Sequence, residues 1–261
     1  MEANGDVDQP GAESRWIVTR PLPDAEELAD RLEEIGVRPL ISPALAIVPL
    51  TPPAVTERID GVIFTSRNGV RFGAQLAPDR SLRVFAVGEA TAEEARRAGF
   101  TNVLAADGDV QSVAALIADT LAPSGRTDPL RLLHPAGAHR AGDLDRMLSA
   151  SGIRVDSVSA YTAEPATGLS EEAYGSLVDG TVAGVLLFSP RTAALIAHLV
   201  TASGMDDRLR GVYAVCLSGN VADQIRHLPW RNVVVARARS TEAVLDAVSH
   251  LPSKPPARQR G

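Results

Sequence analysis

The amino-acid sequence predicts an α/β fold: two domains, each built on a parallel sheet, joined by two bridging strands with a cleft between the domains. An apolar run at residues 61–64 is followed by Ser66 and a helix-like segment, and residues 184–187 followed by Ser189 repeat this arrangement. Buried parallel strands are apolar throughout and pass into helices in this way. Because the unit occurs twice, the chain is expected to contain two related halves.

The composition is that of a globular protein. A chain of 261 residues can form one large or two modest domains, and 45% hydrophobic with 22% charged residues is an ordinary balance. Aromatic residues make up only 4% and the net charge is −6, which argues against nucleic-acid binding. No apolar run reaches the roughly 18 residues needed to span a membrane, and the acidic N-terminus lacks a secretory signal. We therefore expect a cytoplasmic protein with neither a membrane nor a nucleic-acid partner.

The first ordered element is expected at residues 16–20, an apolar strand stopped by Pro21, after a disordered lead-in at residues 1–14. Asp24 is a suitable cap for the helix that follows, which Gly36 closes. Residues 37–50 contain three prolines, so they predict an edge or bridging strand rather than a central one.

The middle of the chain alternates between strand and helix patterns. The expected elements are strand–helix units at 60–77 and 83–99, a helix from Ser112, a strand at 130–134, a turn at 135–138, a helix at 139–151 and a second bridging strand at 153–162. The two bridges bracket one half of the chain. We therefore expect a discontinuous domain at 15–46 plus 163–250, an inserted domain at 47–154, a return strand at 155–162 and a disordered tail at 251–261.

Small and basic residues follow the predicted strands, where an open parallel sheet presents its ligand crevice. Small residues let backbone amides approach an anion, and arginines add charge-assisted bonds. Tight turns also require such residues for conformational reasons alone, but the six loops together favour anion binding. The candidate residues are Arg20, Thr65, Ser66, Arg67, Gly88, Thr91, Ala136, Gly137, Arg140, Ser189, Pro190 and Ser218.

Several common catalytic devices are missing from the sequence. The segment after Gly88 lacks the glycine spacing of a dinucleotide fingerprint, and no phosphate-binding loop is present. His134 and His139 have no matching cysteine or carboxylate, so His134 is interpreted as a polar crevice residue at a strand end and no metal site is expected. Cys216 is interpreted as a core residue. Tyr161, on the second bridge, is either a half-buried strand aromatic or a side chain directed at the cleft.

The ordered set of short motifs resembles the uroporphyrinogen-III synthase family. The matching segments lie at residues 18–21, 63–66, 86–92, 158–162 and 187–190, and together with their spacing they cover residues 15 to about 248. The resemblance implies two α/β domains joined by a two-stranded ladder. It also implies the reaction: hydroxymethylbilane loses water and closes to uroporphyrinogen III with inversion of its last pyrrole ring, without cofactor or metal. By the same resemblance, Tyr161 assists departure of the hydroxyl group as a proton donor, and Thr91 faces the cleft.

One turn departs from the family pattern. Where a Gly-Pro-x-Thr-Ala-like turn is usual, residues 218–222 read Ser-Gly-Asn-Val-Ala, so Ser218 replaces the glycine and Val221 the threonine. An inactive synthase-like domain that binds or senses a tetrapyrrole is therefore an alternative, and a binding protein for another polycarboxylate is a more distant one. We expect a monomer, and leave open a transient contact with the bilane synthase that acts upstream.

Overall fold

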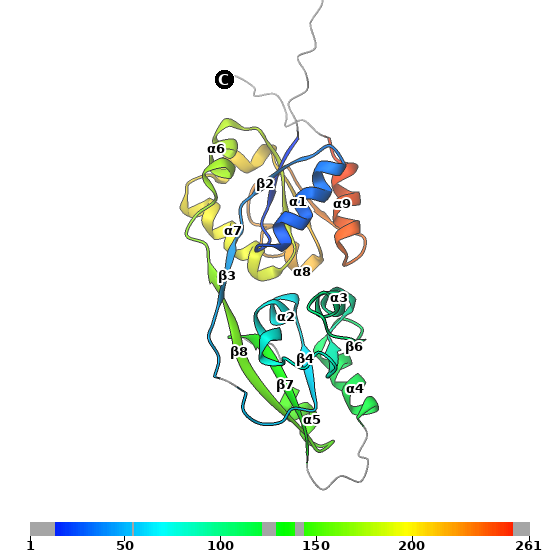
Figure 1. The fold of residues 1–261 in the computed structure, drawn as a ribbon. Coiled ribbons are helices and arrows are strands. Elements are labelled where there is room, and N and C mark those ends of the chain that lie inside the picture. The colour runs from blue at the N-terminus through cyan, green and yellow to red at the C-terminus, as the bar shows by residue number, and fades with distance from the viewer. Residues whose placement is uncertain (1–13, 54, 122–128, 139–143, 253–261) are drawn as a thin grey trace, which may run out of the picture. The chain divides into compact units, whose positions relative to one another are not determined.

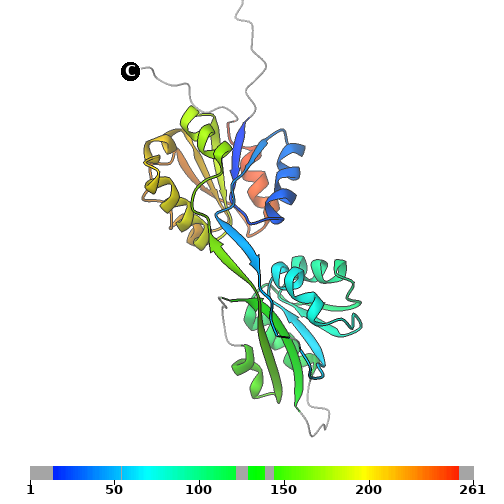
Figure 2. The ribbon, with the colours of Figure 1, turned by 60° about the vertical axis from the view of Figure 1, so that its left-hand side comes forward.

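The computed structural model describes residues 14–53, 55–121, 129–138 and 144–252. Almost all of the predicted lead-in and tail, Arg140, and the beginning of the helix predicted from residue 139 lie outside these ranges. The chain divides into two compact units, each described by itself below (Figures 1 and 2). Unit 1 comprises the chain up to Ala46 together with the chain from Glu164 onward, and unit 2 comprises Ile47–Ala163.

Unit 1 is built on a five-stranded parallel sheet. Its strands, in spatial order, are β11 (Asn232–Val235), β10 (Tyr213–Cys216), β9 (Val182–Leu187), β1 (Arg15–Val18) and β2 (Arg38–Ile41). Strand β1 comes from the beginning of the chain and pairs with β9, with Val18 opposite Leu186. The two separate pieces of the chain therefore share one hydrogen-bonded sheet.

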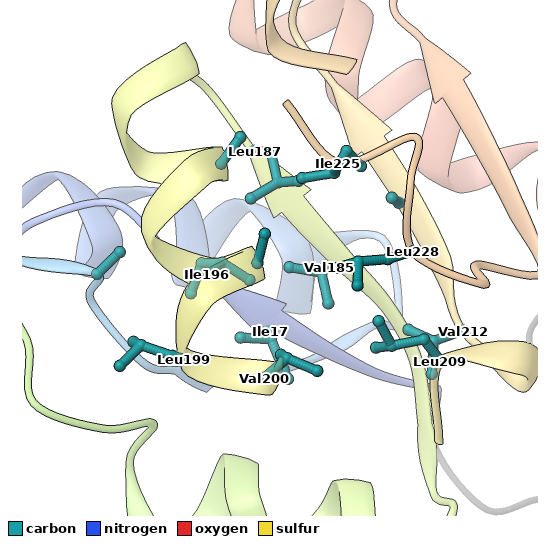
Figure 3. Packing of buried hydrophobic residues seen from close by; sticks show 14 of the residues in the cluster. Ile17, Val185, Leu187, Ile196, Leu199, Val200, Leu209, Val212, Ile225 and Leu228 are labelled. Carbon is teal, nitrogen blue, oxygen red and sulfur yellow. The ribbon is translucent and has the colours of Figure 1, made fainter. Parts of the chain in front are cut away.

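Helices cover both faces of the unit 1 sheet (Figure 1). One face packs against α1 (Asp24–Glu34) and α9 (Thr241–Ser249); the other packs against α6 (Glu171–Asp179), α7 (Pro190–Ala202) and α8 (Gly219–Ala222), with a 3-10 turn η2 at Asp206–Gly211. Figure 3 shows the second of these layers, in which Ile17 of β1 and Val185 of β9 lie among side chains of α7 such as Val200. This burial of aliphatic side chains is the main source of stability for the unit.

Unit 2 is built on a six-stranded sheet. Its strands, in spatial order, are β3 (Leu45–Pro49), β8 (Ile153–Pro165), β7 (Leu130–Gly137), β4 (Gly61–Phe64), β5 (Arg83–Ala86) and β6 (Asn102–Ala105). One face packs against α2 (Arg67–Gly73), which continues into the 3-10 turn η1 (Ala74–Leu76), and α3 (Glu89–Arg97); the other packs against α4 (Val110–Thr120) and α5 (Leu144–Ser149). Strands β3 and β8 are neighbours in this sheet and carry the chain across the two unit boundaries.

The repeat predicted from the sequence is present in the two sheets. In unit 2, Gly61 of β4 pairs with Arg83 of β5, and in unit 1, Gly184 of β9 pairs with Tyr213 of β10. Both repeated glycines allow a close approach: a Cβ at Gly61 would lie 2.8 Å from the carbonyl oxygen of Arg83, and a Cβ at Gly184 would lie 2.3 Å from the ring of Trp16. The predicted fold class of two parallel α/β sheets is confirmed.

Two local predictions were wrong. The segment from Pro135 to Gly137 is not a turn, because β7 continues through it and pairs with β8. The pairing of β7 with β4 runs only from Leu132 to Leu133, so Pro135 lies beyond the part of the strand that pairs on both sides, where a proline is tolerated. Asp24 is the first residue of α1 rather than its cap, which is Pro23, and its carboxylate pairs with Arg20 at 3.1 Å.

Candidate active site

Ser66 stands at the junction between β4 and α2 in unit 2. It has the extended backbone of an N-cap residue, and its Oγ accepts a hydrogen bond of 2.9 Å from the backbone N–H of Gly69. The same Oγ lies 3.0 Å from the phenol oxygen of Tyr161, so the two hydroxyls share a hydrogen bond in which either can be the donor. The Ser66 hydroxyl is therefore hydrogen-bonded both to the first turn of α2 and to the side chain of Tyr161, which comes from the distant strand β8.

Tyr161 is positioned by a β-bulge in β8 and by the absence of a side chain at Gly137. Strand β8 pairs with β7 at Ala136–Ser159 and next at Gly137–Tyr161, so β8 has one extra residue, Ala160, at this point. Such bulges change the direction of side chains and occur often beside active sites. The Tyr161 ring lies against Gly137, where a Cβ would be 3.1 Å from two ring carbons, and its centroid is 5.9 Å from that of Phe72 in α2.

A second set of polar side chains lies beside the first. Thr65 Oγ1 is 3.0 Å from Nε2 of His134, and Nδ1 of His134 is 3.1 Å from Ser157 Oγ. His134 is only 6% exposed and lies inside β7, so its interpretation as a crevice residue at a strand end was wrong. The three side chains link the end of β4, the middle of β7 and the neighbouring β8.

The next strand of unit 2 adds a second helix start. Gly88 caps α3 with extended backbone, and the amide of Thr91 donates to the Gly88 carbonyl oxygen at 3.1 Å. Thr91 is 5% exposed. A bidentate ion pair connects α3 to α2: Nε and Nη2 of Arg71 donate to the carboxylate of Glu94 at 3.1 and 3.2 Å. The bodies of the two helices, rather than their starts, are thus held together by a largely buried pair of charges.

Unit 1 carries the equivalent positions after its own strands. Ser189 caps α7 by accepting a 3.1 Å bond from the Thr192 amide, and Pro190 is the first residue of the helix. The Arg20 guanidinium lies 4.7 Å from the centre of the Phe188 ring. Ser218 is the N-cap of α8 but makes no side-chain cap bond. These residues follow β9, β1 and β10 respectively, as predicted.

The departure from the family pattern at Val221 is explained by packing. Val221 is 1% exposed and belongs to the apolar core of unit 1. Its counterpart in the other half, Thr91, is also buried. The methyl groups of Val221 therefore fill space in the apolar core of unit 1.

The structure brings together only part of the predicted set. Within unit 2, Thr65, Ser66, Gly137 and Tyr161 are joined by the contacts described above, while Arg67 is the half-buried first residue of α2. Ala136 does not lie in a loop: it is inside β7 and 3% exposed, so only its backbone could contribute. Sequence reasoning named His134 only as a polar crevice residue, outside the candidate set, and assigned no site role to Ser157 or Phe72. Their only signal was position: His134 lies two residues from Ala136 and Ser157 four residues from Tyr161 on the same strands, and Phe72 lies six residues after Ser66 in the helix that Ser66 caps.

Three further observations concern metal ligands, membrane spans and the cysteine. Within the described residues, no three of His, Cys, Asp or Glu lie close enough together to hold a metal ion. None of the helices in the described ranges is long and apolar enough to cross a membrane. Cys216 is fully buried in the unit 1 core, as predicted, and burial raises the pKa of its thiol to about 12. A thiol with this pKa remains protonated near neutral pH and is a poor nucleophile.

Comparisons with known proteins agree on one family. The family model described as uroporphyrinogen-III synthase HemD matches residues 26–246. A structure of uroporphyrinogen-III synthetase from Helicobacter pylori is similar with a TM-score of 0.57 and 15% identity, over 90% of this chain and 98% of that one. A mutant uroporphyrinogen III synthase from Thermus thermophilus is similar with a TM-score of 0.51 and 18% identity, over 90% of this chain and 97% of that one. At these identities the structural likeness supports the α/β fold, and the family follows from the matched model.

Proposed function

This chain belongs to the uroporphyrinogen-III synthase family, the cyclising lyases of tetrapyrrole biosynthesis, and from this premise we propose that Tyr161 is the proton donor for its reaction with hydroxymethylbilane. The bilane is a linear chain of four pyrroles carrying eight carboxylates and a terminal hydroxymethyl group. In the reaction the C–O bond of that group breaks and water leaves. A spiro intermediate then forms and reopens to invert the last ring, and a new C–C bond closes the macrocycle as one pyrrole carbon loses its proton.

The hydrogen bond between Ser66 and Tyr161 is the observation that carries this proposal. A hydroxide ion is a poor leaving group, so a positioned acid accelerates its departure as water. The phenol of Tyr161 lies 3.0 Å from Ser66 Oγ, and that oxygen also accepts from the Gly69 amide. When the Ser66 hydroxyl donates to the phenol oxygen, the phenol proton is directed away from Ser66, toward a substrate.

The carboxylates of the bilane provide the reason for the many small residues after the strands. We propose that backbone amides at Ser66, Gly88, Ser189 and Ser218 bind these carboxylates, since each of the four residues caps a helix. Arg20 and Arg67 would add charge-assisted bonds. A protein with a net charge of −6 can then bind a polyanion, because the positive potential is local to the strand ends.

Catalysis in this proposal depends mainly on positioning. Once water has left, the bilane is reactive enough to close without help, so the protein must select which ring carbon forms the new bond. Holding the reactants in one geometry is among the largest contributions an enzyme can make. The two compact units support the predicted organisation of an inserted domain in a discontinuous one.

The inactive alternative loses its support. It depended on the Ser218–Val221 turn, and Val221 is a core residue. We propose that the protein acts as a monomer in the cytoplasm, with the bilane as its ligand.

The proposal is tested by an isomer assay with freshly generated hydroxymethylbilane. Without an enzyme the bilane closes to the uninverted type I isomer. We expect the added protein to shift the product to type III. Only type I product, formed in the presence of folded protein, would overturn the proposed function.

A further inference from the structure

We infer that His134 is a positioning residue for the reaction: its imidazole bridges Thr65 and Ser157 and thereby fixes the distance between the Ser66 and Tyr161 hydroxyls. This inference rests on the proposed function. His134 is not a proton donor to the bilane in this scheme. It acts through its two hydroxyl partners.

The register of the sheet explains why a side chain is needed here. Strands β4 and β8 are not neighbours, because β7 lies between them. The pairing of β4 with β7 ends at Val62–Leu133, three residues before Thr65, whereas β7 and β8 remain paired as far as Gly137. The end of β4 therefore extends beyond its backbone ladder with β7. The 3.0 Å bond from His134 to Thr65 ties it back to that strand.

The two strands joined in this way lead to the hydroxyls of Ser66 and Tyr161. Ser66 follows Thr65 directly, and Tyr161 is four residues beyond Ser157 on β8. His134 is 6% exposed, and a buried imidazole is costly unless its nitrogens have hydrogen-bond partners. Both ring nitrogens have one, on opposite sides of the ring. The satisfied imidazole thus works as a rigid spacer between the end of β4 and the middle of β8.

The two ring nitrogens can be tested separately, because the amides of glutamine and asparagine reach different positions. His134→Gln places its amide near the Nε2 position and keeps a partner for Thr65, whereas His134→Asn reaches only the Nδ1 position and keeps a partner for Ser157. We expect kcat to fall about 10- to 100-fold in His134→Asn, because it loses the bond that ties the end of β4 to β7. In His134→Gln the bond to Ser157 is lost, but the backbone pairing of β7 with β8 still holds Ser157 in place, so kcat should stay within about threefold of wild type. KM should change less than about twofold in both, since neither variant alters a proposed carboxylate contact.

A control separates positioning from loss of stability. Val155→Ala removes two methyl groups from β8, on a residue that is 6% exposed and packs in the adjoining core. It should lower the melting temperature while leaving kcat unchanged. Thr65→Ala provides an independent test should His134→Asn fail to fold: it should lower kcat to a similar extent, and adding His134→Gln to it should produce little further loss.

The outcomes distinguish this inference from the proposed function. If wild-type protein yields no type III isomer, the proposed function fails and the inference fails with it. If wild-type protein yields type III isomer but folded His134→Asn and Thr65→Ala both keep the wild-type kcat, only the inference is overturned. A fall in kcat that Val155→Ala reproduces at the same loss of melting temperature would also overturn it.

Discussion

The phenol oxygen of Tyr161 lies 3.0 Å from Oγ of Ser66, although 95 positions separate the two residues in the chain. Ser66 belongs to a strand–helix junction and Tyr161 to the long strand β8. Their contact joins a capped helix start of unit 2 to the side chain that the family resemblance singles out for proton donation.

Tyr161→Phe removes the phenol hydroxyl and keeps the ring against Gly137 and Phe72. If the hydroxyl is the proton donor, kcat for type III product should fall about 10²- to 10⁴-fold, the usual range for a general acid. Melting temperature should change little. Tyr174→Phe is the matched control, because Tyr174 lies on α6 and is 42% exposed. A Tyr161→Phe enzyme with wild-type kcat would exclude Tyr161 from proton donation.

Ser66→Ala should have two effects that a second cap variant separates. Loss of the bond from the Gly69 amide should lower the free energy of unfolding by about 0.5–2 kcal/mol. Ser240→Ala removes an equivalent cap bond, 3.1 Å from the Ala243 amide at the start of α9, and should cost a similar amount. Chemical denaturation and steady-state kinetics should show that only Ser66→Ala also lowers kcat. Equal kinetics in the two variants would contradict an orienting role for Ser66.

Gly137→Ala tests the close approach of the Tyr161 ring. The added Cβ would lie 3.1 Å from two ring carbons and 3.2 Å from the phenol oxygen, so the ring must shift. We expect kcat to fall about 10-fold or more, as displaced catalytic groups lose efficiency steeply. In Gly175→Ala the new Cβ meets nothing within 4 Å, and this helical position should gain about 0.5–1 kcal/mol of stability at unchanged kcat. If Gly137→Ala also leaves kcat unchanged, the ring position is not critical.

The lowered pKa of Asp156 predicts that the folded state loses stability in acid. Burial raises the pKa of Asp156, but hydrogen bonds and charges from Arg131 and Arg154 outweigh this and hold the pKa below its ordinary value of 3.8. A carboxyl group whose pKa is lowered by folding stabilises the folded state at pH values above 3.8, and this contribution disappears as the pH falls through the folded-state pKa. Asp156→Asn should therefore flatten the decline in melting temperature between about pH 5 and 2. An unchanged decline would contradict the prediction.

The repeated pattern made most of the fold predictable. Apolar runs such as Gly61–Phe64 and Val182–Leu187 identified the central parallel strands, and Ser66 and Ser189 identified the helix starts after them. Local pattern is sufficient for such elements, because the strand, the cap and the amphipathic helix are each encoded within a few consecutive residues.

The polar interior of the site could not be predicted from the same patterns. His134 was interpreted as a strand end because Pro135 follows it, yet the strand continues where pairing with β4 has stopped. The contact between Tyr161 and Ser66 depends on an extra residue in β8 and on the absence of a side chain at Gly137. Both are properties of strand register, which a single sequence specifies weakly wherever several pairings bury the same apolar residues.

The position of β1 imposes an order on folding during synthesis by the ribosome. The strand is made first, but it lies between β2 and β9, and β9 ends at Leu187. The pairing of β1 with β9 and the burial of Ile17 against α7 therefore cannot be completed until β9 and α7 have been translated. Exposed apolar strands in such intermediates are prone to aggregate. A nascent chain of this protein is thus most vulnerable before β9 emerges, and assistance by chaperones would matter most during that interval.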